Sequence, residues 1–148
     1  MRKLKLYIGC SLTQASKEFR EEIEKLKVEL REHFEVFDFV GLVGGTPADV
    51  YRWDIHRCVT KCDLFVAICD YPAIGLGYEM ATAIEKLDKP TLLLVREGVS
   101  VSRLVHGIDH PFCTLEYYQT RQDMMRLICE KASLFSFEQM ELSFEVHV

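Results

Sequence analysis

The chain has 148 residues, of which 49% are hydrophobic, enough for a single compact domain with a buried core. Its net charge of −5 argues against a nucleic-acid backbone as the partner, because such partners select basic surfaces. No apolar run is long enough to span a bilayer, and residues 1–5 lead into no signal-peptide-like apolar stretch. We therefore expect a cytoplasmic protein that does not bind membranes.

The cysteines, at positions 10, 58, 62, 69, 113 and 129, are expected to be reduced thiols. Cys58 and Cys62 are four residues apart and His56 is nearby, but a tetrahedral zinc site needs four ligands. No second pair follows at a familiar spacing. We therefore predict small buried side chains rather than a metal site.

Hydrophobic patterning predicts strands that alternate with helices along the chain. The first strand, residues 4–8, alternates and ends at Gly9, and residues 14–34 carry apolar side chains at helical spacing. Ser11, Thr13 or Ser16 is available to cap that helix. The later expected elements are strand 35–39, loop 41–47, helix 48–61, strand 64–69, helix 78–87, strand 91–95, short helix 102–106, strand 112–115 and helix 120–134.

Residues 64–69 are apolar throughout, the pattern of a strand buried on both faces of a parallel sheet. With the alternation, this predicts an α/β fold over residues 1–134: a Rossmann-like (flavodoxin-like) three-layer sandwich with a five-stranded parallel sheet and right-handed crossovers. The tail, residues 135–148, alternates apolar and acidic residues. It is predicted to be an edge strand, a segment that packs on a partner chain, or disordered.

In such folds the ligand site lies beyond the carboxyl ends of the strands, which here places it in residues 9–13, 41–47, 70–79 and 96–102. In the third of these, Gly75 and Gly77 would let the backbone approach a ligand closely. Glu79 is predicted to fall in the first turn of the next helix, where the helix dipole favours its ionised form. An ionised carboxylate in a strand-end pocket is a suitable nucleophile for the C1′ carbon of a sugar. Glutamate is also common in first helical turns for structural reasons alone.

A wider pattern resembles the nucleoside 2-deoxyribosyltransferase family. The matching features are an Asp63-led apolar strand, the sequence from Gly75 to Glu79, and the pair Lys89-Pro90 before the next strand. The first strand and loop, residues 7–11, resemble the same family. Residues 102–107 resemble a serine-led turn in its hydrolase branch, the 2′-deoxynucleoside 5′-phosphate N-hydrolases. The resemblance covers about residues 3–134 and leaves out the tail.

The resemblance implies roles for individual residues. Glu79 would be the catalytic glutamate, which attacks C1′ or stabilises an oxocarbenium-like transition state. Tyr7 would hold that carboxylate by a hydrogen bond. Asp54, matched with a one-residue shift in spacing, would bind a ribose hydroxyl or pass a proton to the leaving base. The expected substrate-binding positions are Gly9, Ser11, Ala73, Gly75, Gly77 and Ser102.

Two departures bear on the substrate. Ala73 stands where the hydrolase branch has a serine and the transferase branch an aspartate, and Thr13 stands where the hydrolase branch has a basic residue. Both changes weaken recognition of a 5′-phosphate of that kind. The expected substrate is therefore a nucleoside or a nucleotide, and the sugar is passed to another base or to water. The resemblance also implies a homodimer or higher oligomer in which Ser102 reaches a neighbouring subunit.

Two other readings remain open. The Ala73 and Thr13 departures are compatible with a nucleotide-binding or sensing module that keeps the fold without turnover. A different Rossmann-like enzyme is the third possibility. The dinucleotide fingerprint is absent because Gly75 and Gly77 are followed by Tyr78, Glu79 and Met80. We therefore expect neither NAD nor another cofactor.

Overall fold

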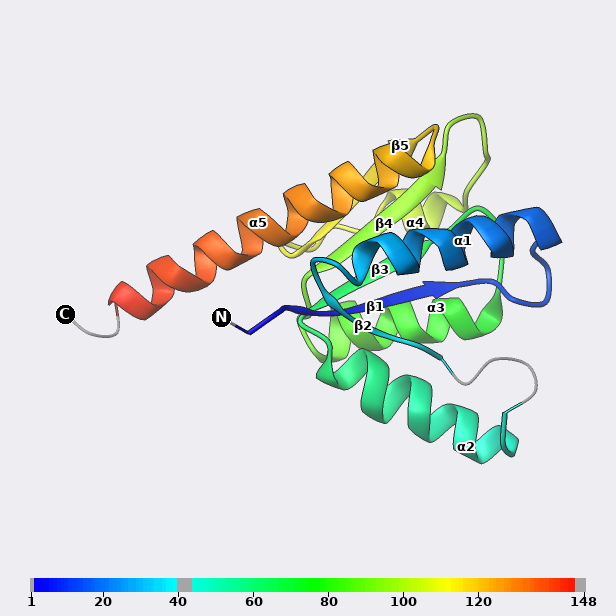
Figure 1. Cartoon of the computed structure of the whole chain (residues 1–148), viewed down its shortest axis with the longest axis horizontal. Helices are drawn as coiled ribbons and strands as arrows, with labels where there is room; N and C mark the ends of the chain where they lie inside the picture. Colours follow the sequence, from blue (N-terminus) through cyan, green and yellow to red (C-terminus); the bar gives the residue numbers. More distant parts are fainter. Residues whose placement is uncertain (1, 40–43, 146–148) are drawn as a thin grey trace.

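A parallel five-stranded sheet lies between two layers of helices in the computed structural model (Figure 1). The structure describes residues 2–39 and 44–145, with side chains as far as residue 135. Its elements in chain order are β1 (Lys5–Cys10), α1 (Lys17–Leu30), β2 (Glu35–Phe37), α2 (Pro47–Tyr51), η1 (Arg52–Val59), β3 (Leu64–Ile68), α3 (Ile74–Ala81), η2 (Thr82–Lys86), β4 (Thr91–Arg96), α4 (Arg103–His106), β5 (Cys113–Tyr118) and α5 (Arg121–Glu145). The π-helices η1 and η2 continue α2 and α3.

The strand order is β2-β1-β3-β4-β5, and every pair of neighbours is parallel. This confirms the predicted fold class, and the order is that of flavodoxin-like sheets. The chain order reverses between β1 and β3. In open α/β sheets the crevice at such a reversal, outside the carboxyl ends of the strands, is where ligands bind.

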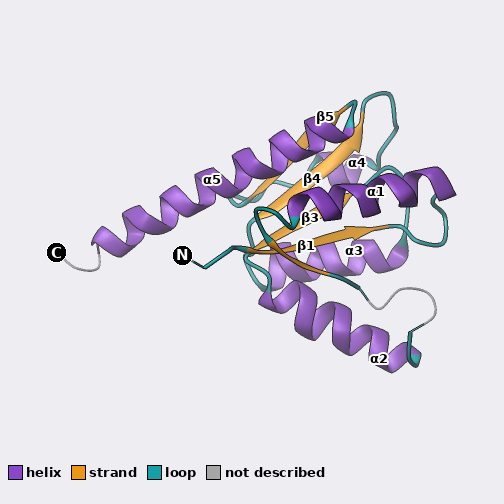
Figure 2. Ribbon diagram, viewed as in Figure 1, coloured by secondary structure: helices purple, strands orange, loops and turns teal. Residues whose placement is uncertain are grey.

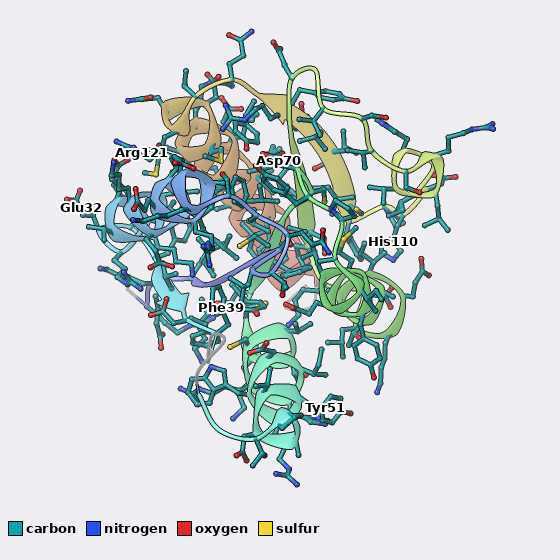
Figure 3. All side chains as sticks on the ribbon, turned by 90° about the vertical axis from the view of Figure 1, so that its right-hand side faces the viewer. Glu32, Phe39, Tyr51, Asp70, His110 and Arg121 are labelled. Atoms are coloured by element: carbon teal, nitrogen blue, oxygen red, sulfur yellow. The ribbon has the colours of Figure 1, made fainter. Side chains whose placement is uncertain are left out.

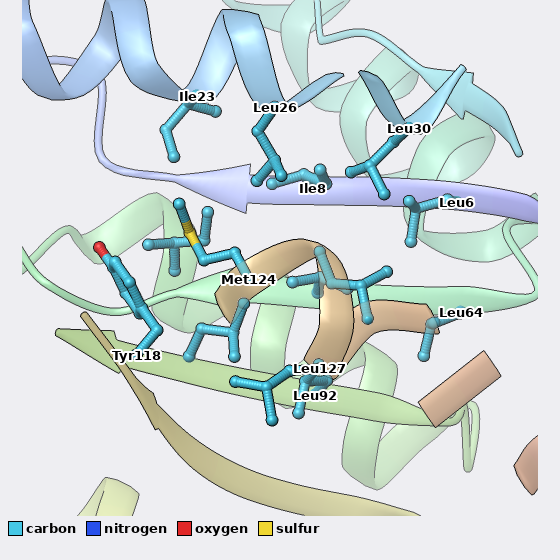
Figure 4. Packing of buried hydrophobic residues seen from close by; sticks show 14 of the residues in the cluster. Leu6, Ile8, Ile23, Leu26, Leu30, Leu64, Leu92, Tyr118, Met124 and Leu127 are labelled. Carbon is cyan, nitrogen blue, oxygen red and sulfur yellow. The ribbon is translucent and has the colours of Figure 1, made fainter. Parts of the chain in front are cut away.

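The two faces of the sheet are covered by different helices (Figure 2). Leu6 and Ile8 of β1 pack against α1 and α5, in the cluster that Figure 4 shows from close by. Tyr7 points to the opposite face, because side chains alternate along a strand, and it packs with η1 and α3. Burial on both faces explains why β3 is apolar at every position.

The helix α3 begins at Ile74, four residues before the predicted start at Tyr78. Gly75 and Gly77 led to the wrong boundary, since each costs about 1 kcal/mol in a helix interior relative to alanine. Leu76 and Met80 are buried against the sheet, and this packing holds the glycine-containing turn in helical form. Gly9 likewise lies inside β1, which continues to Cys10, rather than in a loop. Ser16, one of the three expected caps, accepts a hydrogen bond from Phe19 N.

The tail prediction of an edge strand or disorder is wrong for residues 135–145, which continue α5 to Glu145. The segment 121–145 contains neither glycine nor proline, and a helix that is already nucleated propagates at low cost through such a sequence. Figure 1 shows this end of α5 extending past the sheet. Residues 146–148 lie outside the described residues, and the domain boundary at residue 134 stays a prediction. Within the described part, no helix has the length and apolarity that a membrane crossing needs.

Candidate active site

Tyr7, Asp54 and Glu79 come from three separate elements and meet on one face of the sheet. Tyr7 lies in β1, Asp54 in the first turn of η1, and Glu79 in α3. The Tyr7 hydroxyl donates a hydrogen bond to the Glu79 carboxylate, and both groups interact electrostatically with Asp54. The hydrogen bond that the resemblance implies between Tyr7 and Glu79 is thus present, and the catalytic roles of the three residues stay predictions.

Gly9 gives α3 room to lie close to β1. A Cβ at Gly9 would lie 3.2 Å from Glu79 Oε2, 3.1 Å from Phe65 and 3.0 Å from Leu76 Cδ1. Any larger residue would push against the helix that carries Glu79. Gly9, predicted as a substrate-binding position, thus lies against the carboxylate of Glu79 in this structure, and its binding role stays a prediction.

The second carboxylate oxygen of Glu79, Oε2, is buried and accepts no hydrogen bond from the described residues. The large majority of buried polar atoms in folded proteins are hydrogen-bonded, and a catalytic role is one of the reasons for an exception. The Glu79 carboxylate is thus held by Tyr7, while its other oxygen is buried without a hydrogen-bond partner among the described residues.

Burial raises the pKa of Glu79 from 4.5 to about 8, with a further contribution from the negative charge of Asp54 and an opposing one from the Tyr7 hydrogen bond. The expectation of a carboxylate ionised by the helix dipole is therefore wrong. Because α3 begins at Ile74, Glu79 lies beyond the first turn, where the dipole effect has faded, and it faces the sheet.

Tyr7 remains protonated because burial, followed by the charges of Glu79 and Asp54, raises its pKa far above its ordinary value. Its ring stacks on Phe65 with centroids 5.7 Å apart, which fixes the direction of its hydroxyl. Tyr7 is therefore a permanent hydrogen-bond donor. It can position the Glu79 carboxylate but cannot act as a base.

A separate pocket of about 420 Å³ lies on the other flank of α3. Ala73, Gly77 and Ser102 line it together with mainly apolar side chains, whereas Tyr7, Asp54 and Glu79 do not. The predicted substrate-binding residues are thus divided between two places in this chain. Ala73 is the N-cap of α3 and provides no side-chain hydrogen bond, and Gly75 and Gly77 have open space around their Cα atoms.

The two serines predicted to bind substrate each shape a backbone turn. Ser11 is buried, and its hydroxyl oxygen accepts a hydrogen bond from Gln14 N at 3.3 Å. Ser102 caps α4 by accepting from Leu104 N at 3.2 Å. Both hydroxyl protons can still be donated to a ligand.

Figure 3 looks onto the edge of the sheet at which the strands end. Asp70 is labelled in the upper middle of this view, and Phe39 and Tyr51 are labelled near the helix formed by α2 and η1. Asp70 follows β3 and accepts hydrogen bonds from Arg96 N at 2.8 Å and from the Tyr118 hydroxyl. These bonds fix the connection from β3 to α3. They tie the start of the helix that carries Glu79 to the next two strands.

Sequence patterning did not indicate the contact between Trp53 and Asp38. Trp53 Nε1 donates to the main-chain carbonyl of Asp38 at 2.6 Å. The acceptor is a backbone atom, so residue type at position 38 gives no signal for the pairing.

All six cysteines are free thiols. The described side chains form no group of three or more histidine, cysteine or acidic residues suited to a metal ion.

Comparisons with known proteins support this fold and give two proteins to which the chain is similar. No protein-family model matches the chain. It is 36% identical over 66 residues to the Putative 2′-deoxynucleoside 5′-phosphate N-hydrolase 1 of Thermofilum pendens. The matched region is 44% of this chain and 46% of the relative, so it spans about half the length of that protein.

Among solved structures, the chain is similar to the CMP N-glycosidase BcmB of Clostridium botulinum, with a TM-score of 0.63 and 21% identity. The similarity covers 84% of this chain and 97% of the other, and at this identity it supports the fold alone. One similar protein is named an N-hydrolase and the other an N-glycosidase. Both names agree with the resemblance to the nucleoside 2-deoxyribosyltransferase family that the sequence shows.

Proposed function

We propose that this chain is an enzyme that cleaves the N-glycosidic bond of a (2′-deoxy)nucleoside or nucleoside 5′-monophosphate, with Glu79 as the nucleophile. The observation that carries the proposal is the meeting of Tyr7, Asp54 and Glu79 beside Gly9, with one Glu79 oxygen bound by Tyr7 and the other buried without a partner among the described residues. The similarity to an N-hydrolase and an N-glycosidase supports the reaction class.

In the first step, ionised Glu79 attacks C1′, and the bond between C1′ and the base nitrogen breaks. The base leaves with the bonding electrons and takes a proton from solvent, with Asp54 as the candidate relay. A sugar ester on Glu79 results. Water or a second base then attacks C1′ and gives up a proton to solvent by the same relay, the ester bond breaks, and the Glu79 carboxylate is released. Tyr7 holds the carboxylate throughout.

A product assay with nucleosides and their 5′-monophosphates tests this proposal. Each substrate is incubated with the protein, with and without a second free base, and the products are identified by mass spectrometry. Free base alone indicates hydrolysis, and an exchanged nucleoside indicates transfer. Binding without any product would contradict the proposal and favour a nucleotide-binding module without turnover.

The pH dependence of kcat/KM follows from the raised pKa of Glu79. The nucleophile must be ionised, and the ionised fraction of the free enzyme rises as the pH passes through about 8. We therefore expect kcat/KM to increase about tenfold per pH unit below that value and to level off above it. Initial rates between pH 5 and 10 measure this. A rate that falls as the pH rises from 6 to 8 would exclude Glu79 as the nucleophile.

We further propose a homodimer in which Ser102 reaches the site of the partner. Leu104, which lines the apolar pocket beside α3, is 76% exposed, and Ile74, which follows the lining residue Ala73, is 96% exposed. Such large apolar side chains beside an apolar pocket are typical of an interaction surface. A symmetric contact between two copies would cover both.

Leu104→Glu is therefore expected to convert the dimer to a monomer and to lower kcat/KM by about tenfold, since a buried unpaired charge costs several kcal/mol at an interface. Light scattering after size-exclusion chromatography measures the mass. Val28→Glu is the matched control, because Val28 is 62% exposed on α1, away from the pocket. An unchanged mass for Leu104→Glu would contradict this interface.

A further inference from the structure

Asp38, the residue after β2, joins two helices near the proposed active site. Its main-chain carbonyl accepts hydrogen bonds from Trp53 Nε1 at 2.6 Å and from Cys58 Sγ at 3.6 Å. Its carboxylate accepts a hydrogen bond from Arg31 Nη2 at 2.8 Å and lies 3.8 Å from the buried Lys27 Nζ. One cation in α1, Lys27, and one at its C-cap, Arg31, thus hold the side chain of Asp38, while the Asp38 carbonyl binds two side chains of η1.

The part of η1 that is held in this way carries Asp54. Trp53 directly precedes Asp54, and Cys58 follows it by four residues. The Arg57 guanidinium also lies over the Trp53 ring, 4.8 Å from its centroid, and 5.6 Å from the centroid of Phe37. Asp54 therefore lies between two residues of η1, Trp53 and Cys58, that are both hydrogen-bonded to the residue after β2.

The end of β2 is also directly paired with the strand residue Tyr7. Phe37 is paired in register with Tyr7 of β1. The contacts of Asp38 therefore connect η1 to the same level of the sheet from which the Tyr7 hydroxyl reaches Glu79. A shift of η1 along or away from β2 would change the position of Asp54 relative to that pair.

We propose that Asp38 and Trp53 are positioning residues, which fix Asp54 relative to Glu79 through the Trp53–Asp38 hydrogen bond. The inference rests on the proposed function of the Tyr7, Asp54 and Glu79 group. Misplacement of a reacting group by about 1 Å can cost on the order of 100-fold in rate. One hydrogen bond to a main-chain carbonyl is therefore sufficient to influence turnover without deciding whether the chain folds.

Trp53→Phe tests the inference in activity, because it keeps an aromatic ring for Arg57 and removes the Nε1 donor. We expect kcat to fall by about tenfold. In an Asp54→Asn background the same change should have little further effect, since residues that act through one another are not additive. Thr114→Val is the control. Thr114 lies on β5, at the opposite edge of the sheet from β2, and the change removes the hydrogen bond that its hydroxyl accepts from Lys131 of α5. This variant should leave kcat unchanged.

A second readout needs no turnover. The pKa of Glu79 is measured in solution by NMR titration of ¹³C-labelled glutamate in wild type, Trp53→Phe and Asp54→Asn, with Glu79→Gln to assign the signal. The titratable groups that act electrostatically with Glu79 lie on β1, on η1 and just after η1: Tyr7, Cys10, Asp54, Cys58 and Cys62.

Because the charge of Asp54 raises the pKa of Glu79, displacing Asp54 should lower that pKa from about 8 towards its value in Asp54→Asn. A merely structural role of Trp53 would lower the melting temperature and leave the pKa of Glu79 in place. A wild-type pKa in Trp53→Phe, with effects on kcat that add to those of Asp54→Asn, would overturn the inference. A lowered pKa in a protein that turns over no substrate would support the positioning role and contradict the proposed function.

Discussion

Glu79→Gln is expected to reduce kcat/KM by on the order of 10⁴-fold or more, while the protein still folds. Glutamine occupies nearly the same volume and can accept the Tyr7 hydrogen bond, but it has no ionised oxygen to attack C1′. Initial rates under saturating and limiting substrate measure the effect. Glu116→Gln, at an exposed position of β5, is the matched control and should retain full activity. Turnover by Glu79→Gln at the wild-type rate would contradict the mechanism.

The same variant should be more stable than wild type at alkaline pH. The pKa of Glu79 is about 8 in the folded protein and 4.5 in the unfolded chain, so only the unfolded chain loses its proton between these values. The free energy of unfolding therefore falls as the pH rises from about 4.5 to about 8, by on the order of a few kcal/mol. Glutamine does not titrate. The melting temperatures of the two proteins should differ less at pH 4 than at pH 9, where Glu79→Gln should melt higher.

Asp54→Asn is expected to lower kcat by about 100-fold, because it removes the candidate proton carrier for the leaving base. It also removes a negative charge that raises the pKa of Glu79. The rising limb of kcat/KM should therefore move to lower pH than in wild type. Rates across pH 5 to 10 measure both effects. Asp109→Asn, at an exposed position after α4, controls for the loss of a carboxylate and should change neither.

If the rising limb of kcat/KM stays at its wild-type pH in Asp54→Asn, the charge of Asp54 does not raise the pKa of Glu79. An unchanged kcat would remove Asp54 from the proton transfer. These two outcomes are separable, because the first concerns the ground-state charge and the second concerns the leaving base.

The arrangement of the sheet was predictable because each strand carries its own local pattern. The apolar run of β3 reflects burial on both faces, so hydrophobicity alone indicated a parallel sheet. The alternation of β1 suggested one exposed face, whereas Leu6, Tyr7 and Ile8 are all buried because helices cover both sides of the strand.

The start of α3 was not predictable from residue type. Gly75 and Gly77 disfavour a helix locally, and only the burial of Leu76 and Met80 against the sheet overrides that preference.

The residues of the candidate site could be predicted from the sequence, but the pKa of Glu79 and the contacts that hold η1 could not. The residue types Tyr7, Asp54 and Glu79 were identified by motif and order along the chain, and the geometry brings them together. The raised pKa of Glu79 was not predicted, because it depends on how deeply the carboxylate is buried and on its distance from the helix start. Contacts to a backbone atom, such as that of Trp53 with Asp38, leave no trace in the side chains of the acceptor.

The most direct test of Glu79 as the nucleophile is to trap its sugar ester. A 2′-fluoro-substituted nucleoside or nucleotide slows both glycosyl steps by disfavouring positive charge at C1′, and a good leaving base restores the first. Mass spectrometry of the intact protein and then of its peptides would locate the adduct. We expect one equivalent of free base and one sugar on the peptide that contains Glu79, absent in Glu79→Gln. Release of base without an adduct, or an adduct on another residue, would contradict the account.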